Sequence, residues 1–193
     1  MRNWALATAM LPIALAGCVS FGEDPPDQLL TLTATSTAPA GAATDGPATA
    51  ALAVIEPSAP QALNVTRVPV QLDPSGVAYL RDAMWVEKPA RLFQRLLAET
   101  IRARSDRLVV DMGDLQYAAT TALSGQLLAM GYDAAQGSVV VRYDAVLTRQ
   151  DGTVRTRRFE QVVPGVAADV RAVGPALNQA ANALAVEVAD WVG

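Results

Sequence analysis

The stretch SVVVRYDAVLTRQDGTVRTRRFEQVV, residues 138–163, determines which fold class the sequence predicts. Its first run alternates between Val139, Val141, Tyr143, Ala145 and Leu147 on one face and Val140, Arg142, Asp144, Val146 and Thr148 on the other. This period of two is typical of a strand with one buried and one solvated face. Asp151 and Gly152 follow, a dipeptide that favours a tight hairpin turn. We therefore expect antiparallel strands over residues 138–148 and 154–163.

Outward from this hairpin, further short runs have strand composition. Residues 119–133 extend the hairpin into a meander, and earlier runs cover residues 28–35, 52–56, 65–72, 77–80 and 108–111. Pro69 within its run indicates a sheet edge or a bulge. Residues 36–50 are rich in Ala, Thr, Gly and Pro and contain nothing large to bury, which predicts a mobile loop.

Two segments have helical periodicity. Pro89 begins the first, whose apolar half is Leu92, Phe93, Leu96, Leu97, Thr100, Ile101 and Ala103 and whose polar half is Arg91, Arg95, Glu99 and Arg102. Arg95 and Glu99 have the spacing of an ion pair. The second covers residues 170–192 and has a stripe of Leu177, Ala180, Ala181, Leu184, Val188 and Trp191. Together these elements predict an α+β domain over residues 28–193, a mainly antiparallel sheet with two amphipathic helices packed on one face.

The amino-terminal residues predict export. A basic start at Arg2 precedes about a dozen apolar residues, too few to span a bilayer but typical of a signal peptide, here residues 1–17. The sequence Leu15-Ala16-Gly17-Cys18 resembles the lipobox of bacterial lipoproteins, in which the cysteine is lipidated and becomes the first mature residue. The alternative is an unmodified thiol at Cys18, the only cysteine of the chain.

Lipidation at Cys18 would hold the domain close to a membrane. Residues 18–27 form a tether that Pro25 and Pro26 stiffen, and it reaches at most about 30 Å when extended. Two or three acyl chains give stable anchoring. By resemblance to enterobacterial sorting, Val19 after the cysteine favours the outer membrane.

Composition excludes several functions. The chain of 193 residues carries a formal charge of −4, or −5 without residues 1–17 and their single Arg2, which argues against nucleic-acid binding. No histidine is present, which excludes serine triads and histidine-bearing zinc sites. The acid pairs Asp111 with Asp114 and Asp82 with Glu87 have no supporting spacing, and Gly125, Gly131 and Gly137 form no phosphate-binding motif. We expect no enzymatic activity, no cofactor and no metal.

Tyr79, Arg81 and Trp85 form the candidate partner-binding site. Tyrosine, tryptophan and arginine are favoured anchors of protein interfaces, and these three precede the first helix. The alternative is that the aromatic residues are core, with Trp85 at the seam between helix and sheet. The row of Arg91, Arg95 and Arg102 is interpreted as a solvated face, with acidic lipid headgroups or an acidic partner as the alternative.

The order of these features resembles the ABC-type transport auxiliary lipoproteins, the family of the paraquat-inducible lipoprotein. The similarity rests on the lipobox, on QLLTL, on LNVTRVPV at residues 63–70, on AYLRDAMWVEKPARLFQRLL at residues 78–97, on the hairpin at Asp151-Gly152 and on a last helix ending near Trp191. The resemblance implies a non-catalytic envelope lipoprotein of a lipid or solvent transport system. Its implied partners are an MCE-domain conduit protein and an ABC permease and ATPase, with a homo-oligomer matching the conduit as a further option. A lipid-binding carrier is the alternative function.

Overall fold

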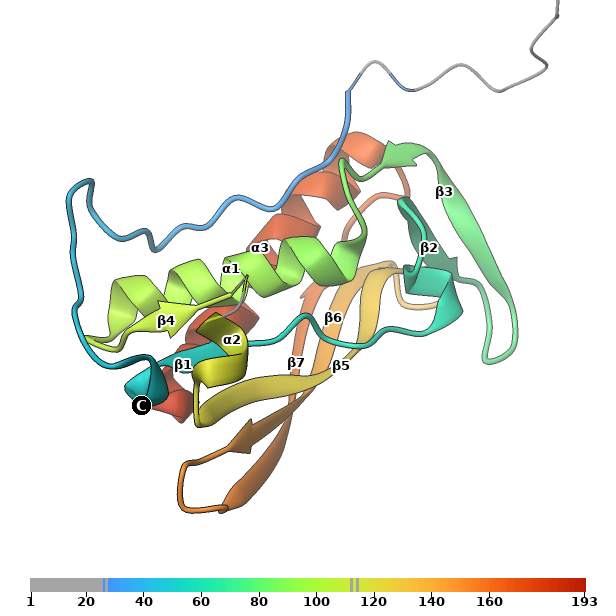
Figure 1. Cartoon of the computed structure of the whole chain (residues 1–193). Coiled ribbons are helices and arrows are strands. Elements are labelled where there is room, and N and C mark those ends of the chain that lie inside the picture. Colours follow the sequence, from blue (N-terminus) through green and yellow to red (C-terminus); the bar gives the residue numbers. More distant parts are fainter. Residues whose placement is uncertain (1–25, 27, 112, 114) are drawn as a thin grey trace, which may run out of the picture.

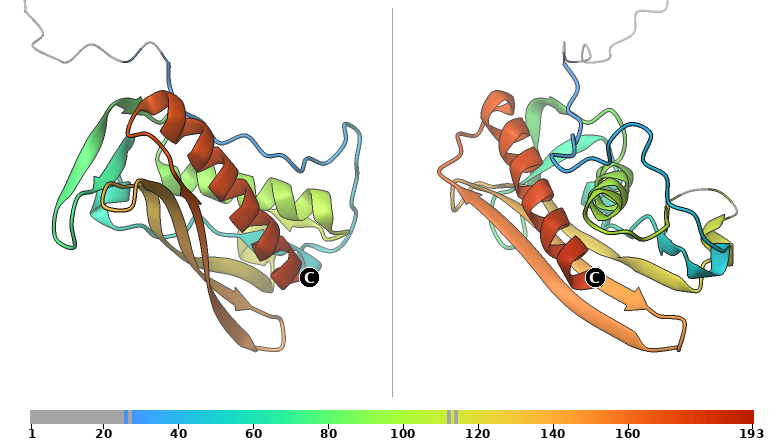
Figure 2. Two further views of the ribbon diagram at one scale, coloured as in Figure 1. Left: turned by 180° about the vertical axis from the view of Figure 1, so that it is seen from behind. Right: turned by 90° about the vertical axis from the view of Figure 1, so that its left-hand side faces the viewer.

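The computed structural model describes residue 26 and residues 28–193 except 112 and 114, which form an α+β domain (Figure 1). Its elements are η1 (Ala48–Ala50), β1 (Leu52–Val54), η2 (Gln61–Leu63), β2 (Arg67–Gln71), β3 (Val77–Met84), α1 (Pro89–Arg104), β4 (Val109–Val110), α2 (Leu115–Ala118), β5 (Thr121–Asp133), β6 (Ser138–Thr148), β7 (Val154–Pro164) and α3 (Val170–Val192). The predicted fold class is confirmed. The sheet is mostly antiparallel, and α1 and α3 lie on the same side of it (Figure 2).

β5 is the strand around which the sheet is organised. One of its edges pairs antiparallel with β6 along nearly its whole length. Its other edge is shared, because β1 pairs parallel with residues 121–123 and β2 pairs parallel with residues 132 and 133. Between these two strands, the Ser58 amide donates to the Gly125 carbonyl at 3.0 Å. β4 adds to β1 in parallel and β3 to β2 in antiparallel, so the sheet is mixed, which the strand patterns alone do not predict.

The predicted meander is confirmed as β5, β6 and β7. The odd-numbered side chains of β6 from Val139 to Leu147 are at most 1% exposed, whereas the even-numbered ones are partly exposed. The turn contains Asp151 and Gly152, as expected, but it is three residues long rather than two. The Arg149 amide donates to the Thr153 carbonyl and the Gly152 amide donates to the Arg149 carbonyl, each at 2.9 Å.

α1 begins at Pro89 as predicted, and the predicted polar half, Arg91, Arg95, Glu99 and Arg102, is exposed or partly exposed, but the buried surface of the helix is wider than the predicted apolar half. Ala90, Gln94 and Ala98 are buried in addition to the predicted apolar residues, while Ala103 is only partly buried. The Gln94 side-chain amide donates to the carbonyls of Val54 and Asp111, at 2.8 and 2.9 Å. A second side of α1 is therefore covered by β1 and the end of β4.

The predicted ion pair between Arg95 and Glu99 does not form. Arg95 contacts Glu87 at 2.5 Å, and Glu99 accepts from Arg102 at 2.7 Å and from the Ala38 amide at 2.9 Å. Arg95 and Glu99 are therefore each paired with another residue, and neither of these pairs has the i,i+4 spacing.

α3 has the bounds that its periodicity predicts. The Asp169 side chain caps its first turn by accepting from the amides of Arg171 and Ala172. The predicted stripe is buried except for Trp191, which is partly buried and packs edge-on against Phe159 at 5.7 Å. On α1, Phe93 packs edge-on against Tyr143 of β6 at 5.3 Å. Both helices therefore close the same hydrophobic core over the meander.

The expected strand at residues 28–35 is not formed. Only Leu30 makes a bridge, to Trp85. The alternation is real, because Leu30, Leu32 and Ala34 pack against the core while the threonines between them are exposed. The backbone of residues 28–35 lies over the helices instead of beside a strand. The hydrogen-bond partners of this segment therefore include side chains.

β3 is longer than predicted and irregular. The register between β2 and β3 shifts between Arg67 and Pro69, which confirms the expected bulge, although β2 lies inside the sheet rather than at its edge. Three additional residues are accommodated on β3, where Asp82 has a φ of 55°, a left-handed conformation that is uncommon outside glycine.

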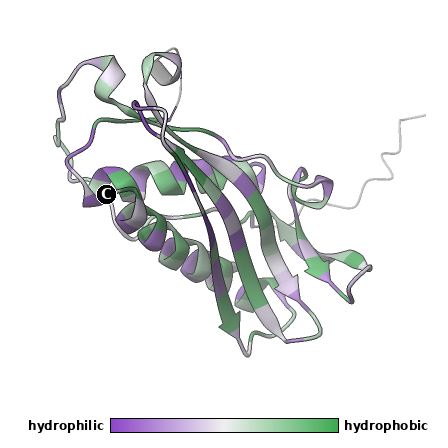
Figure 3. Cartoon of the chain, turned by 90° about the horizontal axis from the view of Figure 1, so that it is seen from below, coloured by the Kyte–Doolittle hydropathy of each residue, from purple (hydrophilic) through white to green (hydrophobic). Residues whose placement is uncertain are grey.

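The sheet face opposite the helices is half-polar. Ion pairs join Arg142 to Glu160 and Arg158 to Asp144, and Val140 and Val162 lie at its other end. The strands accordingly carry both hydrophobic and hydrophilic stretches in Figure 3. Within the described residues, none of the helices has the length and hydrophobicity needed to cross a bilayer.

Candidate anchoring and docking sites

The first feature with functional meaning is the N-terminal strap, which we define as residues 28–38. It begins beside β3, where the Leu30 amide donates to the Met84 carbonyl at 2.7 Å and the Val86 amide donates to the Leu30 carbonyl at 2.9 Å. It then runs over the helices as an extended segment (Figure 1) and ends where the Ala38 amide donates to Glu99 of α1. Several hydrogen bonds therefore hold the first described segment of the chain against the rest of the domain.

Two asparagines of α3 bind the middle of the N-terminal strap. Asn178 accepts from the Thr33 amide at 2.8 Å. Asn182, which is 6% exposed, accepts from the Thr35 amide at 2.8 Å and donates to the Thr33 carbonyl at 2.9 Å. These side-chain amides replace the partner strand that residues 28–35 lack. The sequence signal is a pair of asparagines one turn apart within a helix interior, where asparagine is disfavoured.

The strap connects the domain to the predicted anchor. Cys18, the predicted lipidation site, lies outside the described residues. The described chain begins at Pro26, eight positions after this cysteine, and continues into the strap at Gln28. The segment that follows the predicted anchor therefore contacts β3, α3 and α1 through the strap.

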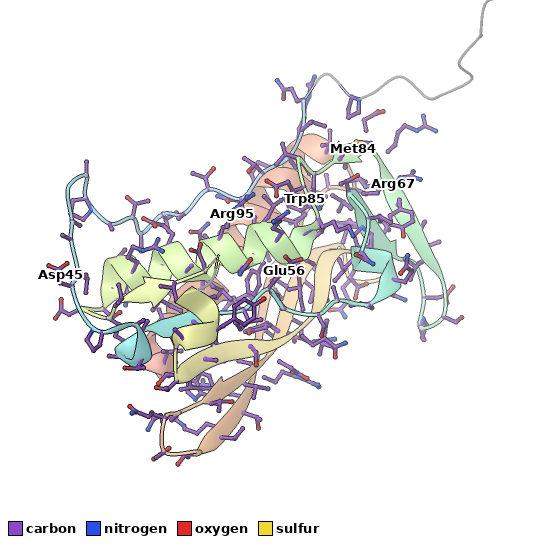
Figure 4. All side chains as sticks on the ribbon, in the orientation of Figure 1. Asp45, Glu56, Arg67, Met84, Trp85 and Arg95 are labelled. Atoms are coloured by element: carbon purple, nitrogen blue, oxygen red, sulfur yellow. The ribbon has the colours of Figure 1, made fainter. Side chains whose placement is uncertain are left out.

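Of the three candidate partner-binding residues, Trp85 is in the core. It is 2% exposed, and Figure 4 labels it beside the start of α1. Its backbone amide donates to the Thr66 carbonyl at 2.7 Å, whereas its indole Nε1 has no hydrogen-bond partner among the described residues. This position agrees with the core interpretation of Trp85.

Tyr79 and Arg81 remain at or near the surface of β3. The Tyr79 ring lies 4.8 Å from the Arg67 guanidinium, and its hydroxyl is 3.5 Å from the Ala62 carbonyl. Arg81 is exposed next to the left-handed Asp82. The structure brings Tyr79 and Arg81 onto one irregular strand but separates both from the buried Trp85 side chain, so the surface part of this site is Tyr79 and Arg81.

The arginine row on α1 is neutralised by acids. Arg91 and Arg95 both contact Glu87, and Arg102 contacts Glu99 and Asp111. The hydrogen bond from Arg95 is the main cause that lowers the pKa of Glu87. Ion-paired side chains agree with a solvated face.

An open recess of about 1080 Å³ lies where the strap begins. Its lining comes from the strap, from the β3 bulge and from the first turns of α3, and includes Leu29, Leu30, Asp82, Arg171, Gly174 and Asn178. The Leu30 side chain approaches Gly174 so closely that a Cβ there would lie 2.8 Å from Leu30 Cδ2. The lining is therefore mixed in polarity, and small residues bring the strap close to α3.

The candidate acids form no metal site within the part of the chain that the structure describes. No group of three or more potential ligands is found there. Asp111 lies 3.8 Å from Arg102, while Asp114 is outside the described residues. Asp82 and Glu87 belong to the β3 bulge and to the ion pairs before α1.

The fold and the strap together define a class: an α+β domain whose amino-terminal segment is bound across both helices. The chain belongs to the family of the ABC-type transport auxiliary lipoprotein component, whose model matches residues 30–189. The match begins at Leu30, so the strap is part of the family domain. The protein is therefore a lipoprotein component of the cell envelope that serves an ABC-type transport system.

Solved structures share this fold. A crystal structure of a Xanthomonas campestris protein of the DUF330 family has a TM-score of 0.68 at 20% identity, covering 85% of this chain and 94% of that one. A second crystal structure, of an uncharacterised protein, has a TM-score of 0.63 at 15% identity over 76% of this chain and 95% of that one. No curated protein sequence matches.

Proposed function

We propose that this lipoprotein is anchored through Cys18 in the outer membrane and docks a periplasmic MCE-type conduit of its transport system to that membrane. Residues 1–17 are the signal peptide and residues 18–27 the tether. The observation that carries the proposal is the N-terminal strap. A chain that entered the domain loosely would leave the domain free to diffuse around its anchor, whereas the strap joins the anchor to the two helices.

The first test concerns the anchor. Cys18→Ser removes the only thiol, so we expect the variant to lose radiolabelled acyl chains and to leave the membrane fraction. Ser20→Ala, two residues later, is the matched control and should fractionate like the wild type. Acylated, membrane-bound Cys18→Ser protein would contradict the proposal.

The second test concerns the partner. The full-length lipoprotein, extracted in detergent, should co-purify with the MCE-domain protein encoded beside it. Fractionation on a density gradient should place the complex with outer-membrane markers. Absence of any complex with the wild-type protein would reject the docking function, and inner-membrane fractionation would reject the assignment to the outer membrane.

A lipid carrier is the second candidate, and the open recess of about 1080 Å³ favours it by volume. A cavity for acyl chains is lined mainly by apolar side chains, but this lining includes Asp82, Arg171 and Asn178. The stripe of α3 that faces the core is rich in alanine and fully packed. We therefore expect native mass spectrometry of residues 26–193, expressed without the anchor, to find no bound phospholipid. Stoichiometric lipid together with no MCE complex would favour the carrier.

A further inference from the structure

The two long helices run in the same direction, which gives the domain two distinct ends. Both start near the strap, because Val86 before α1 bonds to Leu30 and Gly174 of α3 contacts Leu30. Both finish together, because Arg104 of α1 forms an ion pair with Asp190 of α3 at 2.8 Å. A helix of the length of α3 spans about 34 Å. The final turn of α3 and the tip of the β6–β7 hairpin therefore lie far from the end where the described chain begins (Figures 1 and 2).

Four arginines gather at this far end, and we call them the distal arginine cluster: Arg107, Arg149, Arg155 and Arg157. Arg107 donates to the Val192 carbonyl at 3.4 Å and to a backbone oxygen of Gly193, the last residue of the sequence, at 3.3 Å. Burial, together with the nearby charge of Arg149, lowers the pKa of Arg107. Arg155 lies 5.1 Å from the Trp191 ring, and Arg157 lies 4.7 Å from the Phe159 ring. Trp191 and Phe159 are themselves in contact, so the four charges surround one end of α3.

Arg149, Arg155 and Arg157 form no ion pair with an acidic side chain within the described chain. Asp190 in the final turns of α3 is paired with Arg104, and Asp151 accepts from the Thr153 amide in the hairpin turn, a hydrogen bond that lowers its pKa together with the charge of Arg149. On the open face of the same strand, by contrast, Arg158 is paired with Asp144. The protein as a whole is acidic, so this local excess of positive charge is a departure from its composition.

The aromatic rings hold Arg155 and Arg157 in place. A guanidinium stacked on a ring keeps its donors directed outward in its own plane, the arrangement that binds carboxylates with two hydrogen bonds. Both arginines are exposed. Among the residues that the structure describes, β7 pairs with β6 alone, so the outer edge of the strand is unpaired there. Charges on an edge strand also prevent unwanted strand pairing, but that role requires no stacking on Trp191 and Phe159.

We propose that the distal arginine cluster is the surface that binds an acidic face of the periplasmic conduit protein. The inference rests on the proposed function, since it names the surface through which the partner is held. The tether of about 30 Å leads to the membrane from the opposite end of the domain, so the cluster points toward the periplasm rather than toward the lipids that hold Cys18. Charge complementarity then selects a carboxylate-rich protein surface.

The test compares two charge reversals of equal size in the full-length lipoprotein. Arg155→Glu with Arg157→Glu should weaken co-purification of the neighbouring MCE-domain protein by at least about tenfold, because each introduced acid repels the acidic face. Lys88→Glu with Arg91→Glu makes the same charge change at the opposite end and should leave binding unchanged. Wild-type binding should fall as salt is raised. Circular dichroism checks folding, and Arg155→Gln with Arg157→Gln provides a milder variant with the same expected direction.

The outcomes separate this inference from the proposed function. If the wild type binds and both distal variants bind equally well, the cluster is not the docking surface although the docking function stands. If the wild type itself forms no complex, the proposed function fails and the inference fails with it. If the distal variants keep the partner but lose binding to vesicles containing phosphatidylglycerol, the cluster binds a membrane surface and the inference is overturned.

Discussion

Asn182 shows how a single side chain can take the place of a strand. Its amide group has one acceptor oxygen and two donor hydrogens, and the strap and α3 engage both ends of it. A polar side chain that is 6% exposed is stable only when its hydrogen bonds are satisfied. The strap and the asparagine therefore depend on each other: without the strap the buried Asn182 oxygen loses its donors, and without Asn182 the Thr33 carbonyl and the Thr35 amide lose their partner.

We predict that Asn182→Ala destabilises the domain by about 1–3 kcal/mol, because the Thr33 carbonyl and the Thr35 amide lose their partner. Hydrogen exchange should accelerate at the amides of residues 30–38 more than in β5 or β6. Gln179→Ala, an exposed change on the same helix, is the control and should change neither quantity. Uniform exchange throughout the domain would show that the strap does not open separately.

A second residue prediction concerns acid stability. The hydrogen bond from Arg158 is the main cause that lowers the pKa of Asp144 below its usual 3.8. A lowered folded-state pKa stabilises the fold above the unfolded-state value, and this contribution is lost as pH falls through the folded-state value. Asp144→Asn should therefore reduce the free energy of unfolding above about pH 4, and the difference from wild type should shrink at lower pH. Asp45→Asn, at an exposed position that forms no ion pair among the described residues, is the control and should leave the free energy of unfolding near the wild-type value.

At the scale of elements, two glycines of β5 permit close backbone approach. At Gly131 a Cβ would lie 2.4 Å from the Pro69 carbonyl oxygen, and at Gly125 it would lie 2.0 Å from the Asp144 carbonyl oxygen. Both neighbours are backbone atoms, which cannot rotate away as a side chain can. β5 thus contacts β2 on one edge and β6 on the other only because these positions carry no side chain.

Gly131→Ala should accordingly destabilise the domain by about 1–3 kcal/mol or more through overpacking at the junction of β2 and β5. Chemical denaturation measures the loss. Gly46→Ala places the same methyl group where no atom lies within 4 Å and should be near neutral. Equal stability of the two variants would mean that β2 can shift away from β5 at little cost.

Elements defined by their own local pattern could be predicted from the sequence, and elements defined by distant neighbours could not. β6 and α3 have the expected bounds because alternation and helical periodicity lie within each segment. Residues 28–35 alternate equally well, yet their partners are Asn178 and Asn182 rather than a strand. Gln94 is assigned to neither half of the helical pattern, because the carbonyls that accept from it belong to Val54 of β1 and to Asp111 after β4. Of the candidate sites, the burial of Trp85 was one of two alternatives, while the strap and the distal arginine cluster depend on contacts between remote segments.

At the scale of the whole molecule, the loop predicted at residues 36–50 can be divided by its contacts. Its ends are bound, Ala38 to Glu99 and Thr49 to Thr120. Residues 39–47 are exposed, and their hydrogen bonds within the described chain are few. The predicted mobility should therefore be concentrated between the two bound ends.

We predict that a broad-specificity protease first cuts within residues 39–47 under native conditions. The two fragments should remain associated, because the strap stays bound to α3 on one side of the cut and β1 stays in the sheet on the other. Mass spectrometry of the early products and gel filtration of the nicked protein provide the readout. A first cut within β6 or β7 would contradict the stability assigned to the meander.

The shared edge of β5 also sets an order of assembly for the chain. β5, β6 and β7 pair with their sequence neighbours and can form locally, as can β2 with β3, whereas joining β1 to β5 requires residue 121 and joining β2 to β5 requires residue 132. Closing such long loops slows folding and prolongs the exposure of unpaired strands. In the export, amino terminus first, that the predicted signal peptide implies, β1 and β2 emerge long before β5, the strand that joins them to the meander. We therefore expect folding to be completed only after β5 has been exported. Before that point the unpaired strands are exposed, and a periplasmic chaperone would bind them.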